Sequence, residues 1–140
     1  MADVVYNSFK SNIMNGSIDL DTDTIKVALV TSSYTPNADT HQDFADVTNE
    51  VTGTGYTAGG ETLANTAVTT DTTDDEGVFD ADDVTWSAST ITARGAVIYK
   101  DTGSAATSLL IGFIDFTSDQ ASTAGDFTIQ WGSEGILNLN

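Results

Sequence analysis

The sequence contains no cysteine, four basic side chains and a single histidine among 140 residues. The absence of cysteine excludes disulfides, thiolate chemistry and cysteine-ligated zinc, so the fold depends on packing alone. Against the four Lys and Arg stand 21 Asp and Glu, which give a formal net charge of -17. Such a chain repels phosphate groups, and we therefore expect it to bind neither nucleic acid nor an anionic membrane surface.

Long apolar runs are also missing. No stretch approaches the roughly 18 apolar residues that can cross a bilayer. Residues 1–6 lack the basic flank and apolar stretch of a signal peptide, so we expect a protein made in a cytoplasm. Apolar residues form 39% of the chain and recur in separate blocks, which predicts a folded chain rather than an acidic disordered tail. The length suits a single domain over residues 1–140.

Threonine, aspartate and glycine are abundant and helix formers are few, a balance typical of strands joined by tight turns. Period-two alternation or short apolar runs predict strands at 25–30, 61–70, 78–79, 84–86, 91–99, 109–116, 126–131 and 136–139. The most apolar pair, 91–99 and 109–116, predicts a hairpin. About eight short strands separated by turns predict an all-β fold, namely an antiparallel β-sandwich of jelly-roll or Greek-key type. From the alternation we expect its core to contain Val27, Leu29, Val97, Ile98, Ile111, Phe113, Phe127, Ile129 and Trp131.

Two segments have apolar residues at helical spacing instead. The first lies within residues 1–17 and ends at Gly16, a residue typical of helix C-termini. The second covers residues 40–51, behind a possible N-cap at Thr40. We expect one or two short helices of about three turns that cover an end of the sheet. The apolar stripe of the first helix could instead dock on a partner.

Two motifs resemble ligand-binding loops only in part. The glycine-rich stretch 53–60 lacks the lysine of a phosphate loop, and we interpret it as a turn or surface loop. Asp19, Asp21 and Asp23 match the opening of a calcium loop, but Thr24 stands where that loop requires glycine. The acidic groups 74–76 and 80–83 suit turns, in which Asp bonds nearby backbone amides, and weak divalent-cation binding is the alternative.

Catalytic patterns are weak as well. His41 is the only candidate base for a nucleophilic triad, and no nucleophile elbow accompanies it, so we interpret it as a surface histidine. The two carboxylates of a glycosidase must lie a set distance apart in space, and the positions of Asp and Glu along the sequence do not reveal that distance. We therefore predict no catalytic residue, no metal site and no cofactor, and hence a protein that is not an enzyme.

The aromatic residues have two interpretations. Trp86 and Trp131 continue apolar faces of predicted strands, which favours buried positions in the core. Alternatively, the two tryptophans and Tyr34, Tyr56 and Tyr99 could form the aromatic platform of a carbohydrate-binding or adhesin module.

Five blocks follow one another along nearly the whole chain: IKVALV at 25–30, GTGYTAGG at 53–60, FDADDVTW at 79–86, AVIYKD at 96–101 and GDFTIQW at 125–131. As an ordered set they resemble a group of small acidic virion proteins of tailed bacteriophages, including phages of cyanobacteria. The resemblance implies a capsid decoration (cement) protein without catalytic residues, made in the host cytoplasm and bound to the outside of the head. Head-tail connector and tail structural proteins are the alternatives within the same group.

The resemblance also implies partners, which are the major capsid protein and further copies of the chain in a homotrimer. For the capsid or subunit contact we predict the N-terminal helical segment, because its apolar stripe lies beside one of the few cations. The contact residues predicted there are Tyr6, Phe9, Lys10, Ile13 and Met14.

Overall fold

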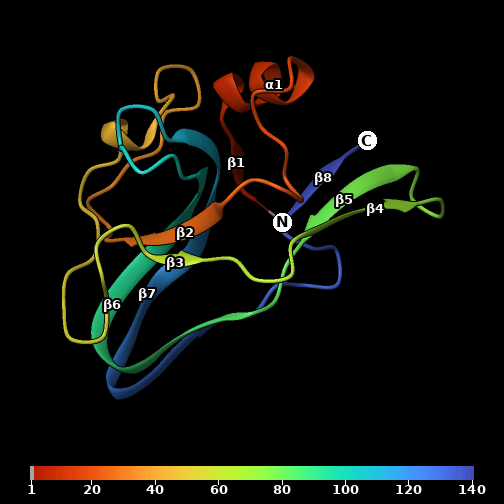
Figure 1. Ribbon diagram of the computed structural model, residues 1–140. Helices are drawn as coiled ribbons and strands as arrows, with labels where there is room; N and C mark the ends of the chain where they lie inside the picture. The colour runs from red at the N-terminus through yellow and green to blue at the C-terminus, as the bar shows by residue number, and fades with distance from the viewer. Residues whose placement is uncertain (1) are drawn as a thin grey trace.

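The computed structural model describes residues 2–140, and within them the chain forms eight strands and one α-helix (Figure 1). The sequence prediction of an all-β antiparallel sandwich is confirmed. One sheet has five strands in the order β1-β7-β6-β2-β3, and the other has three in the order β4-β5-β8. The strands are β1 (Val4–Val5), β2 (Ile25–Val30), β3 (Glu61–Thr62), β4 (Ala67–Asp71), β5 (Glu76–Asp80), β6 (Val84–Lys100), β7 (Leu109–Ile129) and β8 (Leu137–Leu139). The helix is α1 (Asn7–Met14), and a short 3-10 helix, η1, covers Phe44–Asp46.

The five-stranded sheet is buried on both faces. Residues such as Val27 and Ile98 contact the core that lies between the two sheets, which also includes Phe79 and Leu137 of the three-stranded sheet. On the opposite face a second cluster lies under the loop after β2, where Phe44 stacks on Tyr99 with ring centroids 4.1 Å apart. Burial on both faces explains why β2 and the second half of β6 are apolar without strict alternation.

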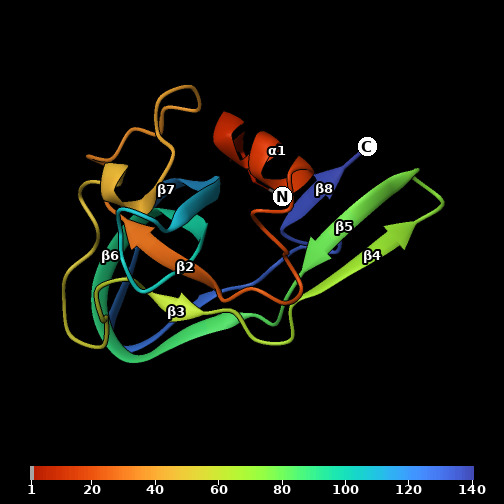
Figure 2. The same ribbon diagram turned by 45° about the horizontal axis from the view of Figure 1, so that its top comes forward.

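Strands β6 and β7 form one long bent ribbon that connects the two sheets (Figures 1 and 2). The predicted hairpin is confirmed, because Ile98 lies opposite Gly112. The prediction was wrong about length: segments 84–86 and 91–99 belong to one strand, and so do 109–116 and most of 126–131. Four register shifts along the pair and positive φ angles at Ala88 and Ala124 interrupt the period-two pattern, which is why alternation alone missed the continuity.

The helix predicted at 40–51 is not present. Only the single turn η1 forms, and Asp43 rather than Thr40 caps it, with its carboxylate accepting from the backbone N–H of Ala45 at 3.1 Å. The chain then pairs with the end of β2, where the N–H of Val51 donates to the carbonyl of Leu29 at 2.9 Å. Backbone pairing with an existing strand therefore overrides the helical spacing.

The single strand predicted at 61–70 is divided between both sheets as β3 and β4. Asn65 adopts a left-handed conformation with a φ of 52° and bends the chain between them. Leu63 is buried, whereas Ala67 and Thr69 are exposed, so these three residues do not share an inward face. A polar turn residue between two short strands explains the difference.

The predicted core is confirmed except at one position. Val27, Leu29, Val97, Ile98, Ile111, Phe113, Phe127 and Ile129 are all buried. Trp131 lies beyond the end of β7 and is only partly buried. Its indole N–H donates to the carbonyl of Asp82 at 2.8 Å, which places the ring at the rim of the core rather than inside it.

Candidate functional site

Helix α1 is anchored through its first turn. Tyr6, the N-cap residue, and Phe9 are both 0% exposed. The Tyr6 hydroxyl forms a 2.9 Å hydrogen bond with the hydroxyl of Tyr34, and Phe9 belongs to the core between the sheets. The helix ends at Met14, and Gly16, two residues later, has a φ of 78° that turns the chain away. One side of α1 is therefore fixed against the body of the protein, and its C-terminal end is left beside the three-stranded sheet.

A groove of about 520 Å³ lies between α1 and the three-stranded sheet. One wall is formed by Ile13 and the chain that follows the helix, from Gly16 to Asp21. The other wall and the floor are formed by one face of the sheet, with Val68, Phe79, Leu137 and Leu139. Both views of the ribbon place α1 beside β8, with β4 and β5 extending outward (Figures 1 and 2). We refer to this hollow as the α1 groove.

Within residues 2–140, three large hydrophobic side chains are exposed. These are Met14, at 82% exposure, Val68, at 51%, and Leu139, at 50%. Val68 and Leu139 line the groove, and Met14 follows Ile13 at the end of α1. Single exposed apolar residues are common on protein surfaces, whereas a group around one concave surface indicates a contact with another molecule.

The rim of the α1 groove is acidic. Hydrogen bonding with Asp21 lowers the pKa of Asp19, and the hydrogen bond to Asp19 together with its charge raises the pKa of Asp21. The neighbouring Asp23 does not join them, because its carboxylate pairs with Lys100 at 2.8 Å and accepts the backbone N–H of Asp19 at 2.8 Å. The groove therefore combines an apolar floor with a pair of repelling carboxyl groups at its edge.

Lys10 is the one basic side chain within residues 2–140 that forms no ion pair. It is exposed on α1, where its Nζ donates to Asn7 Oδ1 at 3.0 Å. A cation on the helix that forms one wall of the groove is free to meet a carboxylate of a partner.

The predicted contact residues divide into two groups. Tyr6 and Phe9 are buried within their own chain, so in this structure neither side chain can contact a partner. Their burial agrees with the other interpretation of the apolar stripe, in which the helix covers an end of its own sheet. Ile13 is partly exposed and lines the α1 groove, and Lys10 and Met14 are exposed elsewhere on the same helix. For these three residues the contact stays a prediction.

Sequence reasoning missed Val68 and Leu139. Val68 lies in the Thr-rich segment 61–70 and Leu139 in the segment 136–139, both of which are predicted only as strands. The signal available was an apolar residue in a polar strand, but only the pairing of β4, β5 and β8 brings the two side chains to one face beside α1.

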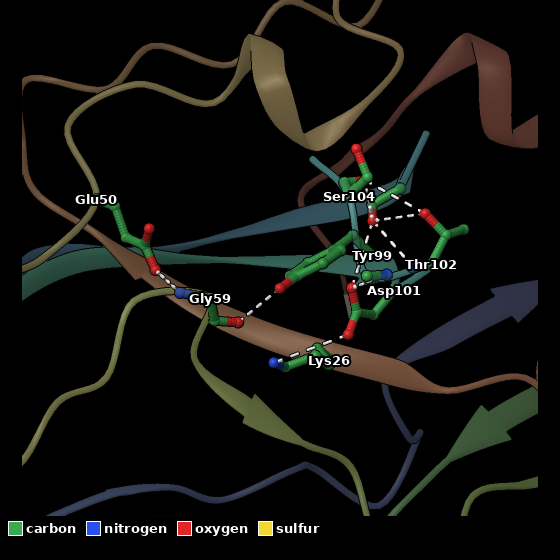
Figure 3. Close-up of polar contacts among 9 residues, drawn as sticks. Lys26, Glu50, Gly59, Tyr99, Asp101, Thr102 and Ser104 are labelled. Carbon is green, nitrogen blue, oxygen red and sulfur yellow. Dashed lines mark hydrogen bonds and ion pairs between the residues drawn. The ribbon is translucent and has the colours of Figure 1, made fainter. Parts of the chain in front are cut away.

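The glycine-rich stretch forms a loop that is fixed through Gly59 to Glu50 and to Tyr99 of β6 (Figure 3). The Gly59 N–H donates to Glu50 Oε1 at 2.6 Å, and the Tyr99 hydroxyl donates to the Gly59 carbonyl at 2.7 Å. Glu50 also accepts the Tyr56 hydroxyl at 2.7 Å, and Lys26 lies 4.0 Å from Asp101. The N–H of Gly59 already donates to a carboxylate and is therefore not available to a phosphate group. The loop supports the sheet and is unsuited to bind phosphate.

His41 belongs to a chain of hydrogen bonds that supports the loop after β2. Its Nδ1 lies 3.1 Å from the hydroxyl of Tyr34, which in turn contacts Tyr6. Beside it, the backbone N–H groups of Gln42 and Asp43 donate to the Asp46 carboxylate and lower its pKa. This arrangement connects buried tyrosines to a partly exposed histidine rather than to a nucleophile.

Carboxylates in the acidic turns accept hydrogen bonds from neighbouring N–H groups, as is typical of Asp in turns. Asp71 accepts the backbone N–H of Thr73 at 2.7 Å, and these turn amides lower its pKa. Asp82 accepts from Asn65 at 2.6 Å, and Asp83 accepts from the backbone N–H of Trp131 at 3.0 Å. Across residues 2–140, no three His, Asp or Glu side chains converge in a way that could hold a metal ion.

The aromatic residues do not assemble into a platform. Trp86, Tyr34 and Tyr99 are 1%, 6% and 2% exposed, so these three rings cannot stack on a sugar. The prediction that Trp86 is buried is confirmed; Trp131 and Tyr56 are partly buried and lie beside the core.

Comparisons with known proteins identify no relative: no family model, no curated protein and no solved structure matches the chain. The helix of the described residues is also too short to span a membrane.

Proposed function

We propose that this protein is a non-enzymatic structural protein of a phage virion, and that it decorates the outer surface of the head by docking on the major capsid protein through the α1 groove. The observation that carries the docking is the exposure of Val68 and Leu139 in one apolar groove of a chain that is otherwise strongly acidic. The five ordered blocks that resemble phage virion proteins supply the choice of partner.

The chemistry of the α1 groove suits a protein partner. Its apolar floor favours an apolar side chain that leaves water, while the carboxyl groups of Asp19 and Asp21 at its edge favour a basic group beside that side chain. Lys10, exposed on the same helix, favours an acidic group of the partner. We further propose that the working unit is a homotrimer, as the resemblance implies, since decoration proteins of this kind bind where three capsomers meet.

The test uses heads of the encoding phage assembled without this protein. The wild-type chain should sediment with the heads, and its mass in solution should be that of three chains. A full-length protein that fails to bind the heads would refute the proposed function. Binding at the head-tail junction or on the tail, seen by electron microscopy of labelled virions, would favour the connector or tail alternative.

The α1 groove itself is tested by a matched pair of variants. Val68→Glu places a charge in the groove, whereas Thr69→Glu places the same charge on the opposite face of β4, among the residues that line a separate surface. We expect Val68→Glu to weaken head binding by about tenfold or more, which corresponds to about 1.4 kcal/mol, and Thr69→Glu to leave it unchanged. Equal binding of the two variants would refute the α1 groove as the contact.

A further inference from the structure

Strand β7 leaves most of one edge unpaired. On that side β1 pairs only with Gly112 and Phe113, and the N–H of Asp115 is then capped by the carboxylate of Asp3 at 2.7 Å. On its other side β7 pairs with β6 as far as Ile129 opposite Val84. Within the described residues no strand covers the outer edge from residue 116 to 129, which runs along the bent ribbon far from α1 (Figure 1).

A groove of about 480 Å³ accompanies the last part of this edge. Aromatic side chains from both arms of the bend line it: Phe116 lies 6.2 Å from Phe127 between ring centroids, and Trp131 lies just beyond the strand. Trp131 is fixed there by its backbone N–H on Asp83 and its indole N–H on the Asp82 carbonyl. The other residues that line the groove include Gln120, Asp126, Thr128 and Gln130, so most of its surface is polar and its apolar part includes the aromatic side chains. An open strand edge beside such a groove provides backbone groups for pairing and an aromatic surface for the side chains of an added strand.

The edge has only part of the protection that natural sheets use. Exposed edges are commonly blocked by lysine or proline, and residues 116–129 contain neither. A bulge at Thr117, with a φ of 66°, and another positive φ at Ala124 interrupt part of the edge. The regular stretch that remains beside the groove is 127–129, where β7 pairs residue by residue with β6, and Asp126 lies directly before it at a register shift.

The negative charge along the edge of β7 favours a basic partner. Asp119 and Asp126 are exposed and form no ion pair within the described residues, while Arg94 is bound to Asp115 at 3.0 Å. A second copy of this chain is a poor match, because three of its four cations are already paired with carboxylates. The complement of this edge is an extended strand with Lys or Arg at alternate positions and apolar residues between them.

We propose that the edge of β7 at residues 126–129 accepts such a basic, extended segment of another protein as an additional antiparallel or parallel strand, with its apolar side chains in the groove lined by Phe116, Phe127 and Trp131. This inference does not depend on the α1 groove, which lies on a different part of the molecule and is lined by different residues.

The probe is the labelled peptide Lys-Val-Thr-Val-Lys-Val-Thr-Val-Lys, with binding to the full chain followed by fluorescence anisotropy. Two comparison peptides carry Glu in place of Lys or N-methyl groups on alternate backbone nitrogens. We expect each comparison peptide to bind about tenfold more weakly or worse, because one loses the charge match and the other loses strand pairing. Hydrogen exchange should slow at the β7 amides near residues 126–129 when the Lys peptide is bound.

A matched pair of charge reversals separates this site from general attraction to an acidic protein. Asp126→Lys changes the edge, and Asp74→Lys makes the same change in the exposed turn between β4 and β5. We expect only Asp126→Lys to weaken binding, by about fivefold or more. Equal effects of the two reversals, undiminished binding of the N-methylated peptide, unchanged exchange at residues 126–129 or no binding of the Lys peptide would each overturn the proposal. Val68→Glu should leave this binding unchanged, so the outcome is independent of the head-binding test.

Discussion

Gly60 lies where any side chain would collide with the backbone of β2. A Cβ at this position would stand 1.9 Å from the carbonyl oxygen of Val27 and 2.7 Å from the Cα of Ala28. Its φ of 74° is also left-handed, a conformation that only glycine adopts without strain. The close approach allows Gly59 to form the contacts shown in Figure 3 and the Tyr56 hydroxyl to accept the backbone N–H of Leu29 in β2, so a single residue determines how the loop docks.

The first prediction compares Gly60→Ala with Gly103→Ala. Gly103 has a similar φ of 86°, but no atom lies within 4 Å of its hypothetical Cβ. Gly103→Ala should therefore lower the free energy of unfolding only by the left-handed strain, about 1–2 kcal/mol. Gly60→Ala adds a backbone collision and should lower it by about 1–3 kcal/mol more. Denaturant midpoints measure the stability of both variants. Equal midpoints would show that the loop can move away from β2 without loss of stability.

At the scale of elements, stability centres on the paired strands β6 and β7. Phe113 of β7 is 5% exposed, packs edge-on against Tyr34 at 5.8 Å and covers Gly95 of β6, where a Cβ would lie 2.6 Å from the Phe113 ring. This packing joins the long ribbon to the loop after β2. The small residue at position 95 and the large one at 113 are thus a complementary pair across the two strands.

The second prediction is that Phe113→Ala lowers the free energy of unfolding by about 3–5 kcal/mol, because it removes a buried ring and leaves a cavity. Val68→Ala, a truncation at a side chain that is 51% exposed, serves as the control and should change it by no more than about 0.5 kcal/mol. Both values come from urea or guanidinium unfolding. A Phe113→Ala midpoint as high as that of the control would contradict the core described for this face.

At the scale of the whole molecule, all four tyrosines have raised pKa values. Burial is the largest cause at each. A hydrogen bond with Tyr34 adds to it at Tyr6, the contact with Glu50 adds to it at Tyr56, and the charge of Asp101 adds to it at Tyr99. The phenols are distributed over both faces of the five-stranded sheet, so their ionisation reports on the entire fold.

The third prediction concerns alkaline pH. In an unfolded chain tyrosine loses its proton near pH 10, whereas the folded protein keeps it to higher pH, so unfolding releases protons in this range. Stability from these groups is complete below about pH 10 and is lost as the pH rises above it. Tyrosinate absorbance should therefore appear together with the loss of circular dichroism. In urea the same absorbance should appear near pH 10. Tyrosinate in a chain with intact dichroism would contradict the burial of these phenols.

Much of the architecture was predictable from local pattern. Alternation predicted β2 at 25–30, and the apolar runs around Ile98 and Ile111 predicted the hairpin. Helical spacing before Gly16 predicted α1. In each segment the apolar residues recur with the period of the strand or helix that the segment forms. The α1 groove was predictable only in part: of the residues that line it, Ile13 was among the predicted contact residues, while Val68 and Leu139 were not.

The sequence by itself determined the class of fold, the strong negative charge and the polar chemistry of the turns, since these depend on residue type and short-range spacing. Only the tertiary structure decided that β6 and β7 are continuous, that 61–70 divides between two sheets and that 40–51 stays largely without helix. It also buried Tyr6 and Phe9 and brought Val68 and Leu139 to one groove. The physical reason is that bulges, strand partners and burial depend on contacts between residues far apart in the chain. The periodicity of a short segment contains no information about such contacts.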